Sequence, residues 1–425
     1  MTRSAATGSP FWAARRVLLA SLTGTAVEFY DFYIYATAAS LVFGALFFPS
    51  QSVASAQLSS YATFAVAFVA RPIGALVFGH YGDRVGRKAT LVASLLLMGG
   101  STFAIAFLPG YARAGLAAPV LLCALRFGQG FGLGGEWGGA ALLAVENAPA
   151  GYRGRFGMFP QLGAPVGFVA ANGLFLLLGL ILPAADFERY GWRLPFLFSA
   201  VLVGLGLWVR LHVAETPAFR ALVASERPAA VPLREVLVSH PAACLAGTAG
   251  VIACFALFYI ATAFALGYGT HTLGIPRTEF LGLQLVAIQC LLVSILVAGS
   301  LTDRLGARAV LVGGAGATVL VGALTPVLLG RGDAPGALAF MAAALFVMGF
   351  VYGPLGAWLT GLFPARVRYT GVSLAFNLGG ILGGGLAPVL AQRLAASGGL
   401  APVGLYLSLA GLASLAGVLL APRSP

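Results

Sequence analysis

Long apolar stretches without a charged residue are the feature that most constrains this chain. Residues 89–112, 156–185, 236–276 and 334–365 contain no Asp, Glu, Lys or Arg. A helix crosses a bilayer with about 20 apolar residues, so each stretch is long enough for one crossing, and the longer ones hold a helix and a loop. They lack the alternation of polar and apolar residues that marks an outer-membrane barrel. We therefore expect an all-α membrane protein.

The composition supports the same class and excludes several others. Of the 425 residues, 59% are hydrophobic and 9% are charged, whereas a soluble domain carries about 25% charge. The net charge of +12 is scattered between apolar segments, which argues against a nucleic-acid surface. The four cysteines are isolated and Lys88 is the single lysine, so we expect no metal, no disulfide, no nucleotide site and no cofactor.

Charged, proline-rich and glycine-rich breaks divide the chain into apolar segments. They predict twelve transmembrane helices at 17–40, 58–80, 89–108, 117–146, 156–182, 193–210, 241–268, 280–301, 309–329, 336–361, 370–394 and 400–420. With both termini inside, 17 of the 25 Lys and Arg residues fall on cytoplasmic segments. This excess predicts a multi-pass protein of the inner (plasma) membrane with both termini in the cytoplasm.

An internal repeat indicates that the chain is a duplication. The segment Gly79–Leu91 recurs at Gly299–Leu311, with identities at the first residue, at the Asp-Arg pair, at the next glycine and at the last leucine. The repeat predicts two pseudo-symmetric six-helix halves, 1–209 and 241–425, joined by a cytoplasmic linker at 210–240. Transporters with two such halves bind solute near the middle of the membrane, between the halves.

The repeated segment also carries a recognisable motif. The first copy, Gly79-x-x-x-Asp83-Arg84-x-Gly86-Arg87-Lys88, resembles the loop motif of the major facilitator superfamily. Further segments resemble the metabolite:proton symporter family, namely 28–35, 70–74, 126–139, 215–217 and 363–371. The resemblance implies the major facilitator fold and the uptake of organic acids or zwitterions, and it links Arg126 to proton transfer.

Two carboxylates in the first helix are candidates for coupling transport to protons. Glu28, Asp31 and Tyr35 share one helical face. Each ionisable group at mid-bilayer costs about 2.5 to 3.5 kcal/mol, so such groups face the bundle interior and are functional candidates. Two carboxylates close together in a low-dielectric cavity favour the binding of a proton. The structural alternative is that they pair with buried arginines or cap backbone groups without titrating.

The fourth and second helices add buried arginines. Arg126, Gln129 and Glu136 form a stripe on the fourth helix, and Arg71 precedes a proline in the second. Because a guanidinium offers a planar set of donors that matches a carboxylate, Arg126 is a candidate to hold an anionic substrate or to pair with a coupling acid. A fixed bridge between Arg126 and Glu136 is the structural alternative. Arg71 is a second candidate for the substrate carboxylate, or a partner of a helix 1 acid.

Uncharged polar residues inside the helices either line the solute cavity or form interhelical hydrogen bonds. They are Tyr259, Trp358, Gln161, Asn172, Gln284, Gln289 and Asn377, and Gln161 is included among the substrate-binding candidates with Arg71, Arg126, Tyr35 and Gln129. The two motif copies predict a conformational latch. Its expected members are Gly79, Asp83, Arg84, Gly86, Arg87, Lys88, Asp303 and Arg304, with Glu146 and Arg368 as partners and with Asp83 at the start of the eleventh helix.

The sequence thus favours a proton-coupled symporter that imports a small organic acid or zwitterionic metabolite by alternating access. We expect a monomer whose partners are the solute, protons and lipid, without nucleic acid and without enzymatic activity. Two alternatives stay open. The first is a proton-coupled efflux antiporter, because Gly163-Ala-Pro165-Val-Gly167 weakly resembles the antiporter motif. The second is a non-transporting membrane sensor.

Overall fold

The computed structural model describes residues 10–49, 52–85, 87–212, 232–364 and 367–422. Within these ranges, the side chains of residues 79–91 are outside the description. The motif residues Gly79, Asp83, Arg84, Arg87 and Lys88 therefore have no described side chain, and Gly86 has no described backbone.

All the described elements are helical. The first half contains α1 (Pro10–Ala38), η1 (Ala39–Phe43), α2 (Gly44–Phe47), α3 (Val53–Val85), α4 (Arg87–Ile105), α5 (Tyr111–Ala114), α6 (Ala117–Leu133), α7 (Glu136–Glu146), α8 (Arg153–Ile181), α9 (Ala184–Arg189), η2 (Gly191–Arg193) and α10 (Leu194–His212). A short helix, α12 (Pro232–Ser239), precedes the second half and lies within the predicted linker.

The second half contains α13 (Pro241–Tyr259), η3 (Ile260–Phe264), α14 (Ala265–His271), α15 (Arg277–Leu305), α16 (Ala307–Leu328), η4 (Leu329–Arg331), α17 (Ala334–Tyr352), α18 (Leu355–Gly361), α19 (Arg368–Gly380), η6 (Ile381–Gly385), α20 (Ala387–Gly398) and α21 (Leu400–Leu420). Each of the twelve predicted helices is present. Within the described residues, eleven spans are long and apolar enough to cross a membrane, and α4 contributes a shorter apolar segment, Val92–Ile105.

The first helix is longer than the sequence predicted. It continues beyond residue 40 through the π-helical turn η1 into α2 and ends at Phe47. The physical reason is that Leu41–Phe48 is still apolar, and the first residue that opposes a helix is Pro49. The fourth helix is instead divided, because α6 ends at Leu133 and α7 begins at Glu136.

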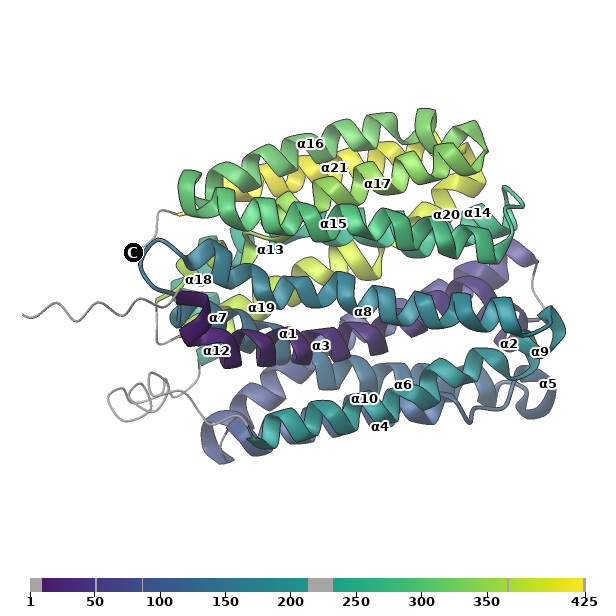
Figure 1. The fold of residues 1–425 in the computed structure, drawn as a ribbon, viewed down its shortest axis with the longest axis horizontal. Coiled ribbons are helices and arrows are strands. Elements are labelled where there is room, and N and C mark those ends of the chain that lie inside the picture. The colour runs from purple at the N-terminus through teal and green to yellow at the C-terminus, as the bar shows by residue number, and fades with distance from the viewer. Residues whose placement is uncertain (1–9, 50–51, 86, 213–231, 365–366, 423–425) are drawn as a thin grey trace, which may run out of the picture.

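The two halves lie side by side in Figure 1, with the first in purple to teal and the second in green to yellow. Contacts between the halves are made by α8 with α15, by α3 with α19, and by α7 and α8 with α18. We call the end where α1 begins and α21 ends the terminal end, and the end that holds α2, α5, α9 and α14 the distal end (Figure 1).

Helix α3 packs closely against α6 and the residue that follows it. A Cβ atom on Gly130 or on Gly134 would collide with the α3 backbone at Ala67 and Arg71, respectively. These positions therefore require glycine, as expected for helices that pack through small residues in a membrane. The approach brings Arg71 of α3 next to the helix that carries Arg126.

Candidate functional site

The buried charges of the described residues all belong to the first half. They are Glu28, Asp31, Arg71, Arg126 and Glu136. In the described part of the second half, the buried polar side chains are the amides Gln284 and Asn377 and the hydroxyls of serine and threonine. The predicted interior position of the five charged groups is confirmed. The charged chemistry is therefore confined to helices α1, α3, α6 and α7.

Arg126 is a fully buried cation enclosed by aromatic rings. Its exposed fraction is 0%, and its guanidinium carbon lies 3.9 Å from the ring centroid of Tyr35, 4.2 Å from that of Phe32 and 4.8 Å from that of Phe64. Its Nη1 donates to Gln129 Oε1. Its Nε and Nη2 atoms have no hydrogen-bond partner among the described residues. The rings supply some cation–π attraction, but two donors are left to receive a ligand.

Gln129 links Arg126 to the backbone of the first helix. Its Oε1 accepts the hydrogen bond from Arg126, and its Nε2 donates to the carbonyl oxygen of Asp31 at 2.9 Å and to Thr102 Oγ1 at 2.8 Å. The amide therefore fixes the position of the guanidinium relative to α1. The predicted stripe on the fourth helix is confirmed for Arg126 and Gln129, because the two side chains lie on one face and are joined by a hydrogen bond.

The carboxylate of Asp31 lies deep between α1 and α10. Its exposed fraction is 0%, and its Oδ1 accepts a hydrogen bond from Ser199 Oγ at 2.5 Å. Its Oδ2 has no hydrogen-bond partner among the described residues, and none of the ion pairs found there involves Asp31. Ser199 was missed by the sequence analysis, because a serine in an apolar helix carries no signal of the partner it contacts 168 residues away.

Glu136 is placed apart from Arg126. Its Oε1 accepts a hydrogen bond from Ser94 Oγ at 2.8 Å, and no ion pair joins it to Arg126 among the described residues. The alternative of a fixed bridge between these two side chains is thus wrong. The break between α6 and α7 separates the two residues, since the helix does not continue regularly from Leu133 to Glu136.

The other predicted substrate residues lie around the same core. Tyr35 exchanges a hydrogen bond of 2.6 Å with Thr63, and Gln161 Oε1 accepts one of 3.1 Å from Trp137 Nε1. Arg71 lies over the rings of Phe32 and Phe68, with guanidinium-to-centroid distances of 5.4 and 5.5 Å.

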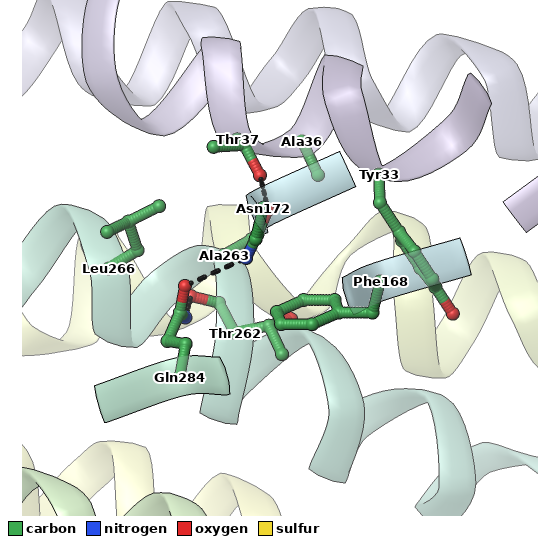
Figure 2. Close-up of a pocket in the computed structure, with 9 residues that line it drawn as sticks. All are labelled: Tyr33, Ala36, Thr37, Phe168, Asn172, Thr262, Ala263, Leu266 and Gln284. Atoms are coloured by element: carbon green, nitrogen blue, oxygen red, sulfur yellow. Dashed lines mark hydrogen bonds between the residues drawn. The ribbon is translucent and has the colours of Figure 1, made fainter. Parts of the chain in front are cut away.

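A small cavity lies between the halves (Figure 2). It measures about 10 Å³, which is room for one water molecule. Its lining residues come from α1, α8, η3, α14 and α15, and they are Tyr33, Ala36, Thr37, Phe168, Asn172, Thr262, Ala263, Leu266 and Gln284. Asn172 and Gln284 were among the uncharged cavity candidates, whereas Gln289 is exposed and bonds to Leu285 of its own helix.

The halves contact each other at the distal end through hydrogen bonds to backbone carbonyl groups. The carbonyl oxygen of Ala263, in the π-helical turn η3, accepts from Tyr61 Oη at 2.7 Å and from Ser40 Oγ at 3.1 Å. His271 Nε2 lies 3.1 Å from the carbonyl oxygen of Ser40. A π-turn leaves carbonyl groups without their usual helical donor, and these carbonyls are bonded across the interface.

The terminal end is closed by both charged and neutral contacts. Asp303 Oδ1 accepts from Gly154 N at 2.6 Å, and Asp303 Oδ2 lies 3.3 Å from Arg155 Nε. Arg368 Nη1 lies 3.5 Å from Glu146 Oε1. Tyr369 Oη donates to the Gly135 carbonyl at 2.5 Å. The second motif copy thus holds the start of α8, and Arg304 beside it is exposed.

Within the described residues, the two halves are therefore in contact at both ends, and a water-sized cavity lies between them. The predicted position of Asp83 at the start of α19 lies outside the described residues, as do the predicted contacts of Arg84, Arg87 and Lys88. The contact of Asp303 with the start of α8 is the counterpart, in the other half, of the contact that the sequence predicts for Asp83.

Comparisons with known proteins agree with this architecture. Residues 16–242 match the family model "Sugar (and other) transporter". The chain is 50% identical over 415 residues to the inner membrane metabolite transport protein YhjE of Escherichia coli, covering 96% of this chain and 94% of YhjE. The chain belongs to the sugar and metabolite transporters of the major facilitator superfamily.

Two further comparisons define the family and the fold. The shikimate transporter of Escherichia coli is 38% identical over 400 residues, covering 90% of this chain and 88% of that protein. The solved structure of the proton:xylose symporter XylE with 6-bromo-6-deoxy-D-glucose superimposes with a TM-score of 0.75 at 17% identity, covering 97% of this chain and 95% of XylE. The predicted superfamily and fold are confirmed, and the protein is a metabolite transporter rather than an enzyme.

Proposed function

We propose that this transporter imports a small organic acid or zwitterionic metabolite together with protons, through alternating access to one central site. The observation that carries the proposal is Arg126, a fully buried cation with two unbonded donors and no acidic partner among the described residues. The relation to a shikimate transporter supports it, since shikimate is a carboxylate.

Arg126 is the proposed anchor for the substrate carboxylate. A guanidinium presents several donors in one plane and binds a carboxylate through two parallel hydrogen bonds. The free Nε and Nη2 atoms of Arg126 are the donors available for such a pair. A buried charge without a partner is expensive in a membrane, so an anionic solute lowers the free energy of this site. Tyr35, Gln129, Gln161 and Arg71 complete the proposed substrate surroundings.

Asp31 is the proposed proton carrier. It is fully buried, its hydrogen-bond partner is the neutral Ser199, and its backbone is tied to Arg126 through Gln129. A substrate carboxylate and a proton bring opposite charges, so binding both leaves the net charge of the site unchanged. When both are bound, the added charges compensate each other. The halves can then move past each other without carrying an uncompensated charge through a low-dielectric interior. Glu28 and Glu136 are the other candidates for proton coupling.

The contacts at the terminal end are the proposed conformational latch. We infer from the excess of Lys and Arg on the terminal segments that this end faces the cytoplasm and that the protein lies in the inner membrane, as the name of the related YhjE states for that protein. Asp303, Glu146 and Arg368 then hold the cytoplasmic side closed. Opening this side requires that these contacts break while the distal contacts hold.

The direct test is substrate-dependent acidification of proteoliposomes that contain an internal pH dye. A panel of small carboxylates and zwitterions is added outside, without an imposed gradient. We expect acidification with at least one class of solute, and we expect Asp31→Asn to abolish it while counterflow of the same solute persists. Glu188→Gln, which changes an exposed acid in α9, is the matched control and keeps the acidification.

Two results would contradict the proposal. Counterflow without acidification in the unmodified protein indicates a uniporter or an exchanger. Internal alkalinisation on adding solute indicates exchange of solute for protons, which is the efflux antiporter alternative.

A further inference from the structure

The cavity between the halves differs in chemistry from the core that holds the buried charged residues. No residue that lines it carries a formal charge. One wall is aromatic, because Tyr33 stacks on Phe258 with ring centroids 4.9 Å apart and lies 5.5 Å from Phe168. The other walls contain the side chains of Thr37, Asn172 and Gln284 (Figure 2). A solute fragment here meets neutral polar groups on one side and rings on the other.

A chain of hydrogen bonds runs through these polar residues and crosses between the halves. Thr37 Oγ1 donates to Asn172 Oδ1 at 2.6 Å, and Asn172 Nδ2 donates to Gln284 Oε1 at 3.1 Å. Gln284 Nε2 donates to the carbonyl oxygen of Thr262 at 2.9 Å. The middle bond joins α8 of the first half to α15 of the second. It therefore has to break or be replaced when the two halves separate at this level.

The amides keep unused hydrogen-bonding capacity. A carboxamide has two N–H donors and an oxygen that accepts two bonds, whereas the hydrogen bonds described above for Asn172 and Gln284 use one N–H on each. Donors and acceptors thus stand next to each other in one small space. A hydroxyl group both donates and accepts, so it satisfies such a pair. A carboxylate only accepts and an ammonium only donates, so each would leave part of the pair unpaired.

The size of the cavity agrees with the same ligand group. Its volume of about 10 Å³ holds one water-sized group, and an alcohol hydroxyl is of this size. The aromatic wall provides an apolar surface for the carbon atoms that bear the hydroxyl.

We propose that Thr37, Asn172 and Gln284 form a second part of the substrate site and bind a hydroxyl group of the solute. This inference rests on the proposed function, in which Arg126 binds the carboxylate. Together the two parts select a hydroxylated carboxylate over a plain one. The solute hydroxyl replaces the bond between Asn172 and Gln284, so the halves separate around a solute that keeps both amides satisfied.

The test compares matched probes on purified protein in detergent. The probes are 3,4-dihydroxycyclohexanecarboxylate and cyclohexanecarboxylate, which differ only in hydroxyl groups, and glycine betaine as a zwitterion without hydroxyls. The dependence of the Tm on probe concentration gives an apparent Kd without any assumption about protons. We expect the dihydroxy acid to bind about tenfold more tightly than the plain acid, the effect of one or two net hydrogen bonds.

Three variants locate the selectivity. Asn172→Ala and Gln284→Ala are expected to weaken the binding of the dihydroxy acid about tenfold. They are expected to weaken the binding of the plain acid less than about twofold. Thr37→Val keeps the side-chain shape, and we expect it to reduce the selectivity in the same direction even if either alanine variant folds poorly. Gln289→Ala changes the same residue type on the same helix at an exposed position, and it is expected to change neither Kd.

The outcomes separate this inference from the function on which it rests. If both acids bind equally, or if the variants weaken both acids by the same factor, the bond between Asn172 and Gln284 is structural and the inference is wrong, while the carboxylate site stands. If glycine betaine binds and loses affinity in Asn172→Ala, the cavity is a site for an ammonium group instead. If glycine betaine binds the unmodified protein but neither acid does, this inference is wrong while the carboxylate site stands. If none of the three probes binds, the proposed carboxylate site fails and this inference fails with it.

Discussion

The two halves share one fold but divide the chemistry between them. The buried charged residues of the described chain lie in the first half, and the corresponding interior of the second half is bonded through amides and hydroxyls. Both halves nevertheless contain a π-helical turn at the same stage of their first helix, η1 at Ala39–Phe43 and η3 at Ile260–Phe264. The duplication therefore kept the backbone geometry while the side-chain chemistry diverged.

The position of the coupling acids shows this divergence at single residues. The two π-turns are offset by 221 residues, since they begin at 39 and 260. With this offset, Glu28 and Asp31 correspond to Ala249 and Ile252. At these two positions the first half has carboxylates and the second half has apolar residues. The comparison agrees with the proposal that the first half provides the charge-dependent binding. The buried polar side chains that the second half provides are neutral, and its charged contacts, those of Asp303 and Arg368, lie at the terminal end.

The strongest test of this division is to remove the buried cation. Arg126→Gln is expected to weaken the binding of a carboxylate solute by at least about 30-fold, since losing one member of a desolvated charge pair costs about 2 to 5 kcal/mol. The measurement is the concentration dependence of counterflow in proteoliposomes. Arg393→Gln removes an exposed arginine from α20 of the second half.

We expect this control variant to bind like the unmodified protein. Equal losses in the two arginine variants would show that net charge, and not the buried site, governs binding, and the proposed division between the halves would be wrong.

A smaller effect is expected at the one described place where the second half contributes an acid to the interface. Asp303→Asn keeps a hydrogen-bond acceptor for the start of α8 but removes the charge that faces Arg155 and the helix N-terminus. A charge at this position contributes about 0.3 to 1 kcal/mol, so opening of the terminal end should increase about threefold. Labelling of a cysteine placed at Ser373, which is buried at the contact with Gly138, measures this opening.

The labelling experiment uses a background without the four native cysteines. Asp186→Asn, at the distal end, is the matched control and should leave the labelling rate unchanged. An unchanged rate in Asp303→Asn would mean that the neutral bonds from Tyr369 and Asn377 to the broken fourth helix close this end without help from the acid.

The sequence predicted the helices, the duplication and the buried charged residues because each depends on local composition or on a repeated motif. Hydropathy places a helix in the membrane, and the cost of a charge there places Asp31 and Arg126 in the interior. The i, i+3 spacing also placed Gln129 on the same face as Arg126, and the structure joins them. These inferences required no knowledge of how the helices are arranged.

The partners across helices could not be predicted in this way. Periodicity shows which face a residue occupies but not which residue lies opposite. Ser199 and Ser94 have no special spacing, yet they bind Asp31 and Glu136. The stripe on the fourth helix was predicted to continue from Arg126 to Glu136. It does not, because the glycines at 134 and 135 interrupt the helix and their carbonyls bond to Asn377 and Tyr369.

The smallest expected effect lies outside the interface, at the start of α17. Asp333 caps this helix, because its Oδ1 accepts from Gly336 N at 2.8 Å and its Oδ2 lies 3.2 Å from Arg331 Nη2. The backbone hydrogen bond from Gly336, with help from Arg331, lowers the pKa of Asp333 below its usual value. Its contribution to stability is therefore present above the unfolded pKa of about 3.9 and is lost as the pH falls through the lower, folded pKa.

Replacing Asp333 by alanine tests this cap. It also compares a charge of the second half that has a structural role with the charges of the first half that are proposed to act in transport. We expect Asp333→Ala to lower the Tm at pH 7 by less than about 2 °C, with no change in counterflow. Asp333→Asn keeps an acceptor for Gly336, and its Tm should fall by less than that of the alanine variant, because asparagine caps a helix about as well as aspartate. The difference between the unmodified protein and Asp333→Asn should disappear as the pH is lowered below the folded pKa. A loss of transport in either variant would contradict the division, since it would place a functional charge in the second half.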